Sequence, residues 1–195
     1  MRFIKLATLI IYILINGCSA FSQNTNNDED SKISLFVEAN ISTILNKIPD
    51  NYEPQYGFAN RGEFDFVTVG KPIQLYTIND TVVYKQLQWR VPIIVNGEYR
   101  ALLTVQKTGN KYIIGDFGAA VLANDIQQKA SKYLDENTIC ILRAYAIGSD
   151  FVIIKNSAGD ILIPLTSAEN YFDSKKIELK PFYTISEIKD LQKHR

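Results

Sequence analysis

The chain has 195 residues, 21 basic and 21 acidic side chains, 46% hydrophobic residues, two cysteines and one histidine. This composition is that of an ordinary globular protein and excludes disorder, collagen and coiled coil for most of the chain. The scarcity of histidine and cysteine excludes most zinc sites and catalytic triads. The balanced charge excludes the strongly basic surface that proteins use to bind nucleic acid. We therefore expect no catalytic residue, no cofactor and no metal ligand.

The first 22 residues predict a signal peptide. Two basic residues precede an apolar run over 6–15, which is too short to span a bilayer comfortably. Two processing sites compete: cleavage after Ser22, with small residues Ala20 and Ser22 at −3 and −1, or cleavage before Cys18, which would then carry a lipid. Both predict export, and they leave open whether the protein is periplasmic, lipid-anchored to the membrane or secreted.

A polar tether and a helix are predicted next. Residues 23–32 are polar and without apolar periodicity, which is typical of a flexible tether, and their acidic triplet lacks the spacing of a calcium loop. From Ser34 to Ile48 the apolar residues recur at helical spacing. We expect Ser34 to cap this helix and Pro49 to end it.

A run of antiparallel strands follows. Ile73–Ile78 alternates with period two, and two further β-rich runs, Trp89–Val95 and Tyr99–Gln106, are joined by Asn96-Gly97. Asn-Gly favours a type I′ hairpin turn, which needs positive φ at both positions. A second turn leads to Lys111–Ile114, so the sequence predicts a three-stranded β-meander.

The C-terminal half returns to helix and then to strands. Leu122, Ile126 and Tyr133 share one helical stripe, with Asp116 before it as a cap or turn residue. The expected elements are a helix over Ala119–Tyr133, strands over Thr138–Tyr145, Phe151–Lys155 and Asp160–Leu165, a helical turn over Ser167–Phe172 and a helix over Ile185–Leu191.

This order predicts an α+β fold: an N-terminal helix, an antiparallel β-meander sheet, a second helix and a C-terminal β-hairpin. We expect one sheet with its helices on one face. Residues 33–195 are predicted to form a single domain, with a subdivision near 135–137 as the alternative.

The central strands carry a resemblance. Gly70-Lys71-Pro72, Trp89-Arg90-Val91-Pro92, Asn96-Gly97-Glu98-Tyr99-Arg100 and Gly118-Ala119-Ala120 follow one another between about residues 65 and 130. This order resembles an uncharacterised group of small exported bacterial proteins, which implies export and a shared α+β core but no activity. The helix and meander are also similar in topology to cystatin-like and PepSY-like inhibitory modules, and topology does not fix function.

Trp89, Arg90 and Arg100 are the candidate ligand-binding residues. The two arginines lie on either side of the Asn96-Gly97 turn, with the single tryptophan beside one of them. A cluster of this kind would stack an aromatic ring or hold a carboxylate. The competing interpretation places Trp89 in the core, with both arginines in solvent.

Other chemistry-bearing residues are weaker candidates. Cys140 lies in an apolar run, which predicts a packed thiol rather than a nucleophile, and His194 lies in a charged C-terminal segment. Glu63 and Asp65 stand two apart and would face one side of a strand, either as a carboxylate pair or as a solvated edge.

Three functional hypotheses follow, in this order. The first is a non-catalytic interaction or inhibitory module of the cell envelope, whose partner is another envelope or extracellular protein. The second is a small-ligand binding protein, and the third is a carboxylate-based hydrolase using Glu63 and Asp65. We expect no nucleic-acid partner, and a membrane contact only through a lipid on Cys18.

Overall fold

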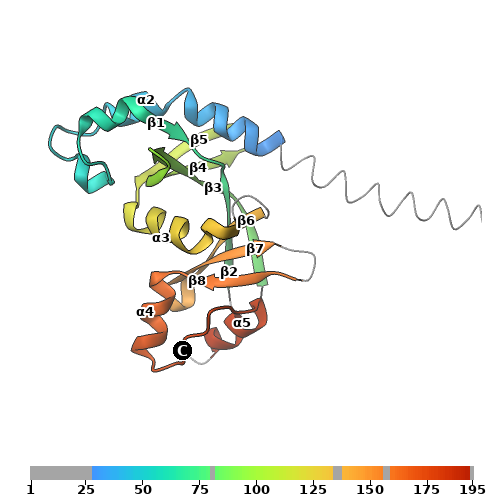
Figure 1. Cartoon of the computed structure of the whole chain (residues 1–195). Coiled ribbons are helices and arrows are strands. Elements are labelled where there is room, and N and C mark those ends of the chain that lie inside the picture. The colour runs from blue at the N-terminus through green and yellow to red at the C-terminus, as the bar shows by residue number, and fades with distance from the viewer. Residues whose placement is uncertain (1–27, 80–81, 134–137, 156–158, 194–195) are drawn as a thin grey trace, which may run out of the picture.

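Figure 1 shows the computed structural model of the chain. The predicted signal peptide with Cys18, the first residues of the predicted tether and His194 lie outside the described residues. No helix in the part that is described has the length and apolar character needed to cross a membrane. The structure describes residues 28–79, 82–133, 138–155 and 159–193.

The fold is α+β, as the sequence predicts, and is built on one mixed sheet. Its strands run in the order β5-β4-β3-β2-β6-β7-β8, and β1 also pairs with β3. All pairings are antiparallel except that of β2 with β6, which joins the meander to the C-terminal strands in one sheet. The strands are β1 (Val67–Val69), β2 (Ile73–Asn79), β3 (Val82–Val95), β4 (Glu98–Thr108), β5 (Lys111–Gly118), β6 (Thr138–Ala144), β7 (Ser149–Lys155) and β8 (Ile161–Pro164).

The predicted hairpin turn between β3 and β4 is confirmed. Asn96 and Gly97 have φ values of 52° and 81°, as a type I′ turn requires. The register shifts just beyond the turn, because Tyr99 pairs with Ile94 and Ala101 pairs with Ile93. Arg100 is therefore the extra residue of a β-bulge, a feature that redirects a side chain relative to the regular ladder.

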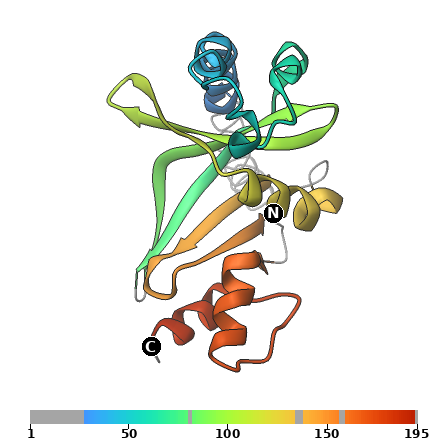
Figure 2. The same cartoon turned by 90° about the vertical axis from the view of Figure 1, so that its left-hand side faces the viewer.

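Helices cover both faces of the sheet, so the expectation of helices on one face is wrong. In β4, Leu103 packs with the N-terminal helices, whereas its neighbour Leu102 packs with α3. Figure 2 shows the N-terminal helices on one side of β3–β5 and α3 on the other. The helices are one over 28–38, α2 (Ile41–Leu45), α3 (Ala120–Ala130), α4 (Thr166–Ser174) and α5 (Ile185–Lys193), with 3₁₀ turns η1 (Glu53–Tyr56), η2 (Arg61–Phe66), η3 (Ser131–Tyr133) and η4 (Tyr145–Ile147).

The N-terminal helix is already formed at Asp28, so the tether predicted over 23–32 and the cap predicted at Ser34 are wrong for this stretch. Glu29 explains the early start. Its carboxylate accepts a hydrogen bond from Lys107 Nζ at 2.8 Å and one from the Tyr112 hydroxyl at 2.9 Å. These bonds tie the first turns to β4 and β5. Although partial burial raises the pKa of Glu29, the bonds from Lys107 and Tyr112 lower it overall.

Two local predictions are also corrected. Asp116 lies within β5, which continues to Gly118, and the residue that precedes α3 is Ala119 in a left-handed conformation with φ of 53°. Glu63 and Asp65 lie on the 3₁₀ turn η2 and not on a strand.

Candidate functional site

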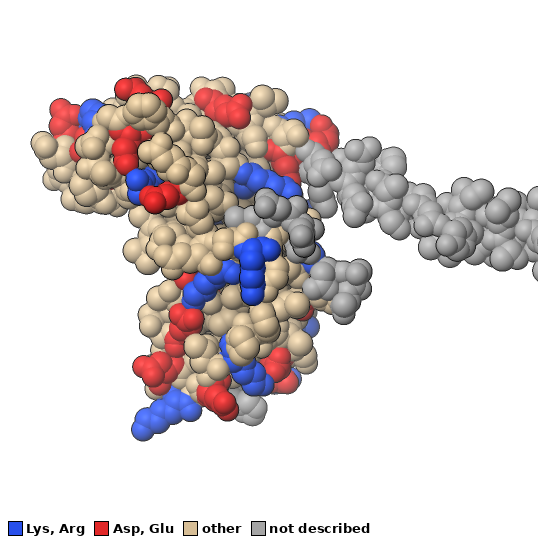
Figure 3. All heavy atoms as spheres, viewed as in Figure 1, with Lys and Arg blue, Asp and Glu red and all other residues tan. Residues whose placement is uncertain are grey.

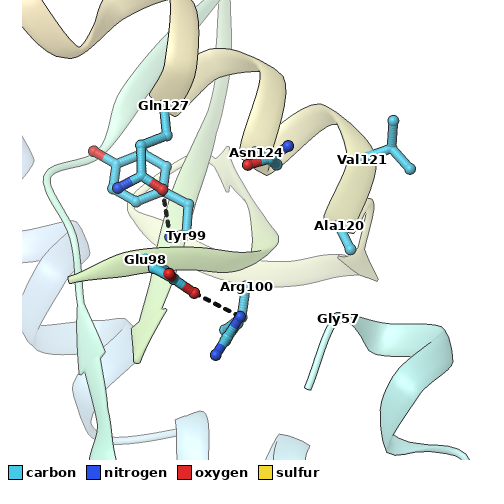
Figure 4. Close-up of a pocket in the computed structure, with 8 residues that line it drawn as sticks. All are labelled: Gly57, Glu98, Tyr99, Arg100, Ala120, Val121, Asn124 and Gln127. Carbon is cyan, nitrogen blue, oxygen red and sulfur yellow. Dashed lines mark hydrogen bonds and ion pairs between the residues drawn. The ribbon is translucent and has the colours of Figure 1, made fainter. Parts of the chain in front are cut away.

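Arg100 lines an open hollow on the surface, which we call the Arg100 pocket. Its volume is about 580 Å³. Three parts of the chain meet there: the β3–β4 hairpin, the first half of α3 and the loop after η1 (Figure 4). The lining residues are Gly57, Glu98, Tyr99, Arg100, Ala120, Val121, Asn124 and Gln127.

Gly57 sets how closely the loop approaches the hairpin. Its φ is +93°, and a Cβ atom at this position would lie 2.0 Å from the carbonyl oxygen of Arg100 and 2.8 Å from the Cβ of Ala120. Only glycine tolerates both this backbone conformation and this contact. The loop is therefore packed directly on the backbone of β4 and forms one wall of the pocket.

The guanidinium of Arg100 is held between two carboxylates. Nη2 lies 2.8 Å from Oε1 of Glu63, and Nη1 lies 2.8 Å from Oε2 of Glu98. The Nε atom is buried and has no hydrogen-bond partner among the described residues. Since two acids already neutralise Arg100, the pocket is polar and slightly acidic rather than a receptor for an anion.

Gln127 fixes α3 against the hairpin. Its Oε1 accepts a hydrogen bond from the backbone N–H of Tyr99 at 2.8 Å, and its Nε2 donates to the carbonyl of Gly97 at 2.7 Å. Both bonds satisfy backbone groups at the hairpin end. The two walls of the pocket are thereby joined by side-chain bonds.

Val121 is the apolar element at the rim. Its side chain is 77% exposed, the largest value among the exposed large hydrophobic residues of the described chain. Figure 4 shows it projecting from α3 away from the sheet, with Asn124 one turn further along the helix. Protein interfaces combine an apolar centre with a polar rim, and Val121 beside Asn124 offers both kinds of contact.

The three predicted ligand-binding residues do not form one cluster. Trp89 is 3% exposed and packs in the core beneath the N-terminal helices, as the competing interpretation holds. Arg90 pairs with Thr104 in mid-sheet, whereas Arg100 lies at the hairpin end. The side chains of Trp89 and Arg90 project to opposite faces because they are neighbours on one strand.

The pocket residues from other parts of the chain were not predicted from sequence. Gly57 lies in a loop, and Asn124 and Gln127 lie on the polar face of a helix. For Gly57 no sequence signal pointed to the hairpin. For Gln127 the helical stripe was predicted, but not its proximity to Gly97.

The remaining candidates occupy structural positions. Cys140 is a free buried cysteine, and burial raises the pKa of its thiol to about 11, so it is protonated at neutral pH. Glu63 accepts a hydrogen bond from the backbone N–H of Ala59 at 2.7 Å besides its ion pair with Arg100, and Asp65 is exposed. Within the ranges described, no three His, Cys, Asp or Glu side chains are grouped to hold a metal ion.

The chain was compared with models of known protein families, with curated proteins and with solved structures, and none of the three comparisons gives a match.

Proposed function

We propose that this protein is an exported, non-catalytic interaction module of the cell envelope, and that the Arg100 pocket is where it holds a segment of a partner protein. The observation that carries the proposal is the pocket itself: an open hollow of about 580 Å³ with Val121 exposed at its rim. An inhibitory role towards an envelope enzyme is one form that this interaction would take.

The shape of the pocket favours a protein partner over a small molecule. Small-molecule sites typically bury most of the ligand surface. This hollow is open to solvent, so it covers one side of an occupant and leaves the other side free. A protruding peptide segment that remains attached to its own protein fits such a surface.

The lining indicates the chemistry of that segment. Val121 offers apolar contact, Asn124 offers an amide, and the exposed carboxylate of Glu98 accepts hydrogen bonds. Figure 3 shows acidic and basic side chains interspersed over the face that it presents, so long-range charge does not select the partner there. We therefore propose a segment with an apolar side chain next to a basic or amide group.

Export is proposed from the first 22 residues. The intact mass of the mature native protein tests it: a chain that begins at Gln23, or at a lipidated Cys18, supports export. A mature protein that retains Met1 and the apolar run contradicts it.

The interaction is tested with the full-length protein, expressed with its leader and a C-terminal tag. Wild type and Val121→Arg are crosslinked in envelope extract, with Leu179→Arg as the matched control. Leu179 is also an exposed apolar residue, 49% exposed, in the segment between α4 and α5. We expect one stoichiometric partner with wild type and Leu179→Arg and its loss with Val121→Arg. Equal capture by all three proteins would contradict the assignment of the pocket.

A further inference from the structure

The face of the sheet that α3 covers continues into a polar region, which we call the Arg90 region. On β4, Leu102 packs with α3, and Thr104 is the next residue on the same face. On β6, Ile141 packs with α3, and Arg143 is the next. Polar side chains therefore continue the row of apolar ones along this face, and Thr104 among them is fully buried.

Arg90 lies in this region opposite a hydroxyl rather than a carboxylate. It stands directly opposite Thr104, and its Nη1 donates a hydrogen bond to the Thr104 hydroxyl. Among the described residues no carboxylate forms an ion pair with Arg90. A guanidinium has five N–H donors in a planar fork, and most of those of Arg90 have no acceptor in the described chain.

Arg143 supplies a second positive charge nearby. Its Nε and Nη2 donate to the two carboxylate oxygens of Asp150, each at 2.8 Å, so Asp150 is already engaged. Burial lowers the pKa of Arg90 and the charge of Arg143 lowers it further, while Asp116 and Asp150 act in the opposite direction. Arg90 is thus half-buried with charges of both signs around it, and what it offers a bound anion is its N–H donors that lack an acceptor among the described residues.

Further hydrogen-bonding and aromatic groups lie beside Arg143. Thr77 pairs with Arg143 across the parallel β2–β6 ladder, and the side chain of Gln86 donates to the Thr77 hydroxyl at 2.7 Å. Tyr145 is 66% exposed, with its ring 5.9 Å from the Arg143 guanidinium carbon. These groups add hydrogen-bonding and aromatic contacts next to Arg143.

We propose that the Arg90 region binds a small oxyanion, the carboxylate or phosphate group of a soluble ligand, with Arg90 as the principal donor and Arg143 as its charged neighbour. The planar fork of an arginine matches two oxygens of either group. The site uses β2, β3, β4 and β6 and is separate from the Arg100 pocket. It therefore assigns a second binding activity, independent of the proposed protein partner.

The test measures binding of two probes, inorganic phosphate and succinate, by calorimetry and by the shift in thermal unfolding. The proteins are wild type, Arg90→Gln and Lys111→Gln, which removes the same charge from an exposed residue of β5. We expect wild type and Lys111→Gln to bind at least one probe with affinities within about twofold of each other. We expect Arg90→Gln to bind at least about tenfold more weakly.

A third variant, Arg90→Lys, separates recognition from folding. This variant keeps the positive charge but lacks the planar guanidinium group. We therefore expect it to bind the probe more weakly than wild type while its circular dichroism spectrum is unchanged. If Arg90→Gln does not fold, this variant carries the test. The proposal is overturned if wild type binds neither probe, or if the folded Arg90 variants bind as tightly as wild type. Dependence on Arg90 with phosphate alone, or with succinate alone, supports it and names the anion.

Discussion

Replacement of Gly57 by alanine tests how the Arg100 pocket is built. The new Cβ would lie 2.0 Å from the carbonyl oxygen of Arg100, and the residue would keep a φ of +93°. Gly148 provides a matched control, because it also has a positive φ, of +60°, but no atom within 4 Å of the Cβ position. The two substitutions share the backbone penalty, and they differ in the steric overlap.

The magnitudes follow from these two contributions. An alanine in the left-handed region costs about 1–2 kcal/mol, which applies to both variants. Overpacking against a fixed backbone adds about 1–3 kcal/mol, which applies to Gly57→Ala alone. We therefore expect Gly57→Ala to lower the free energy of unfolding by about 2–5 kcal/mol in total, a large part of the roughly 5–15 kcal/mol typical of a domain.

Urea unfolding followed by tryptophan fluorescence provides the assay. The chain has one tryptophan, Trp89, which is 3% exposed in the core and so reports global unfolding. With a urea dependence of about 1–3 kcal/mol per molar, a loss of about 3 kcal/mol lowers the midpoint by about 1 M or more. If Gly57→Ala and Gly148→Ala unfold at the same midpoint, the close contact with Arg100 is refuted.

Three other changes have defined outcomes. Glu29→Gln removes the carboxylate that ties the N-terminal helix to the sheet. We expect the free energy of unfolding to fall by about 1 kcal/mol and amide hydrogen exchange over 28–38, measured by mass spectrometry, to become faster. Unchanged exchange would contradict this role. Burial raises the pKa of the Cys140 thiol from 9.0 to about 11, so the thiol should resist alkylation at pH 8 until urea is added, and rapid alkylation of the folded protein would refute its burial. The contribution of this thiol to stability should be lost as pH rises from about 9 towards 11, because the thiol of the unfolded chain releases its proton at lower pH. Lys180 and a neighbouring backbone N–H lower the pKa of Glu187 from 4.5 to about 2. The stabilisation that the Glu187 carboxylate gives the fold is therefore present above about pH 4.5 and lost as pH falls towards 2. In acid titration, Glu187→Gln should lose less stability over that pH range than wild type, and an identical loss would contradict this role.

Local patterns predicted most elements because they depend on short-range physics. The Asn96-Gly97 turn needs only two backbone conformations, and the helix predicted over Ala119–Tyr133 matches α3 and η3 within one residue. The α+β class followed from the order of such elements. The parallel pairing of β2 with β6 was not predicted, because it joins strands that are distant in the sequence and carries no local signal.

The covering of both sheet faces did have a signal in the sequence. Every residue from Ala101 to Val105 is buried, and strands buried on both faces carry continuous apolar runs rather than alternation. The start of the N-terminal helix had a weaker signal in the sequence, because its acidic residues are also typical of a tether. The bonds that Glu29 accepts come from Lys107 and Tyr112, which are distant in the sequence.

The candidate site was predictable only in part. Arg100 was selected from its place beside the hairpin turn, but its pairing with Glu63 and its contact with Gly57 depend on η2 and on the loop after η1. The expected grouping of Arg90 with Arg100 was wrong, because Arg90 stands opposite Thr104 in mid-sheet and Arg100 occupies the bulge at the hairpin end. The sequence therefore identified the chemical type of these residues, whereas their neighbours depend on the register in which the strands pair.

The most direct test of the central claim is site-specific photocrosslinking of the full-length protein in the cells that produce it. A photoreactive amino acid is placed at Val121, at the rim of the Arg100 pocket, or at Leu179, between α4 and α5. We predict one discrete adduct of higher mass from position 121 and none from position 179. The absence of an adduct at 121, or the same adduct from both positions, would contradict the proposal that the Arg100 pocket holds a partner protein.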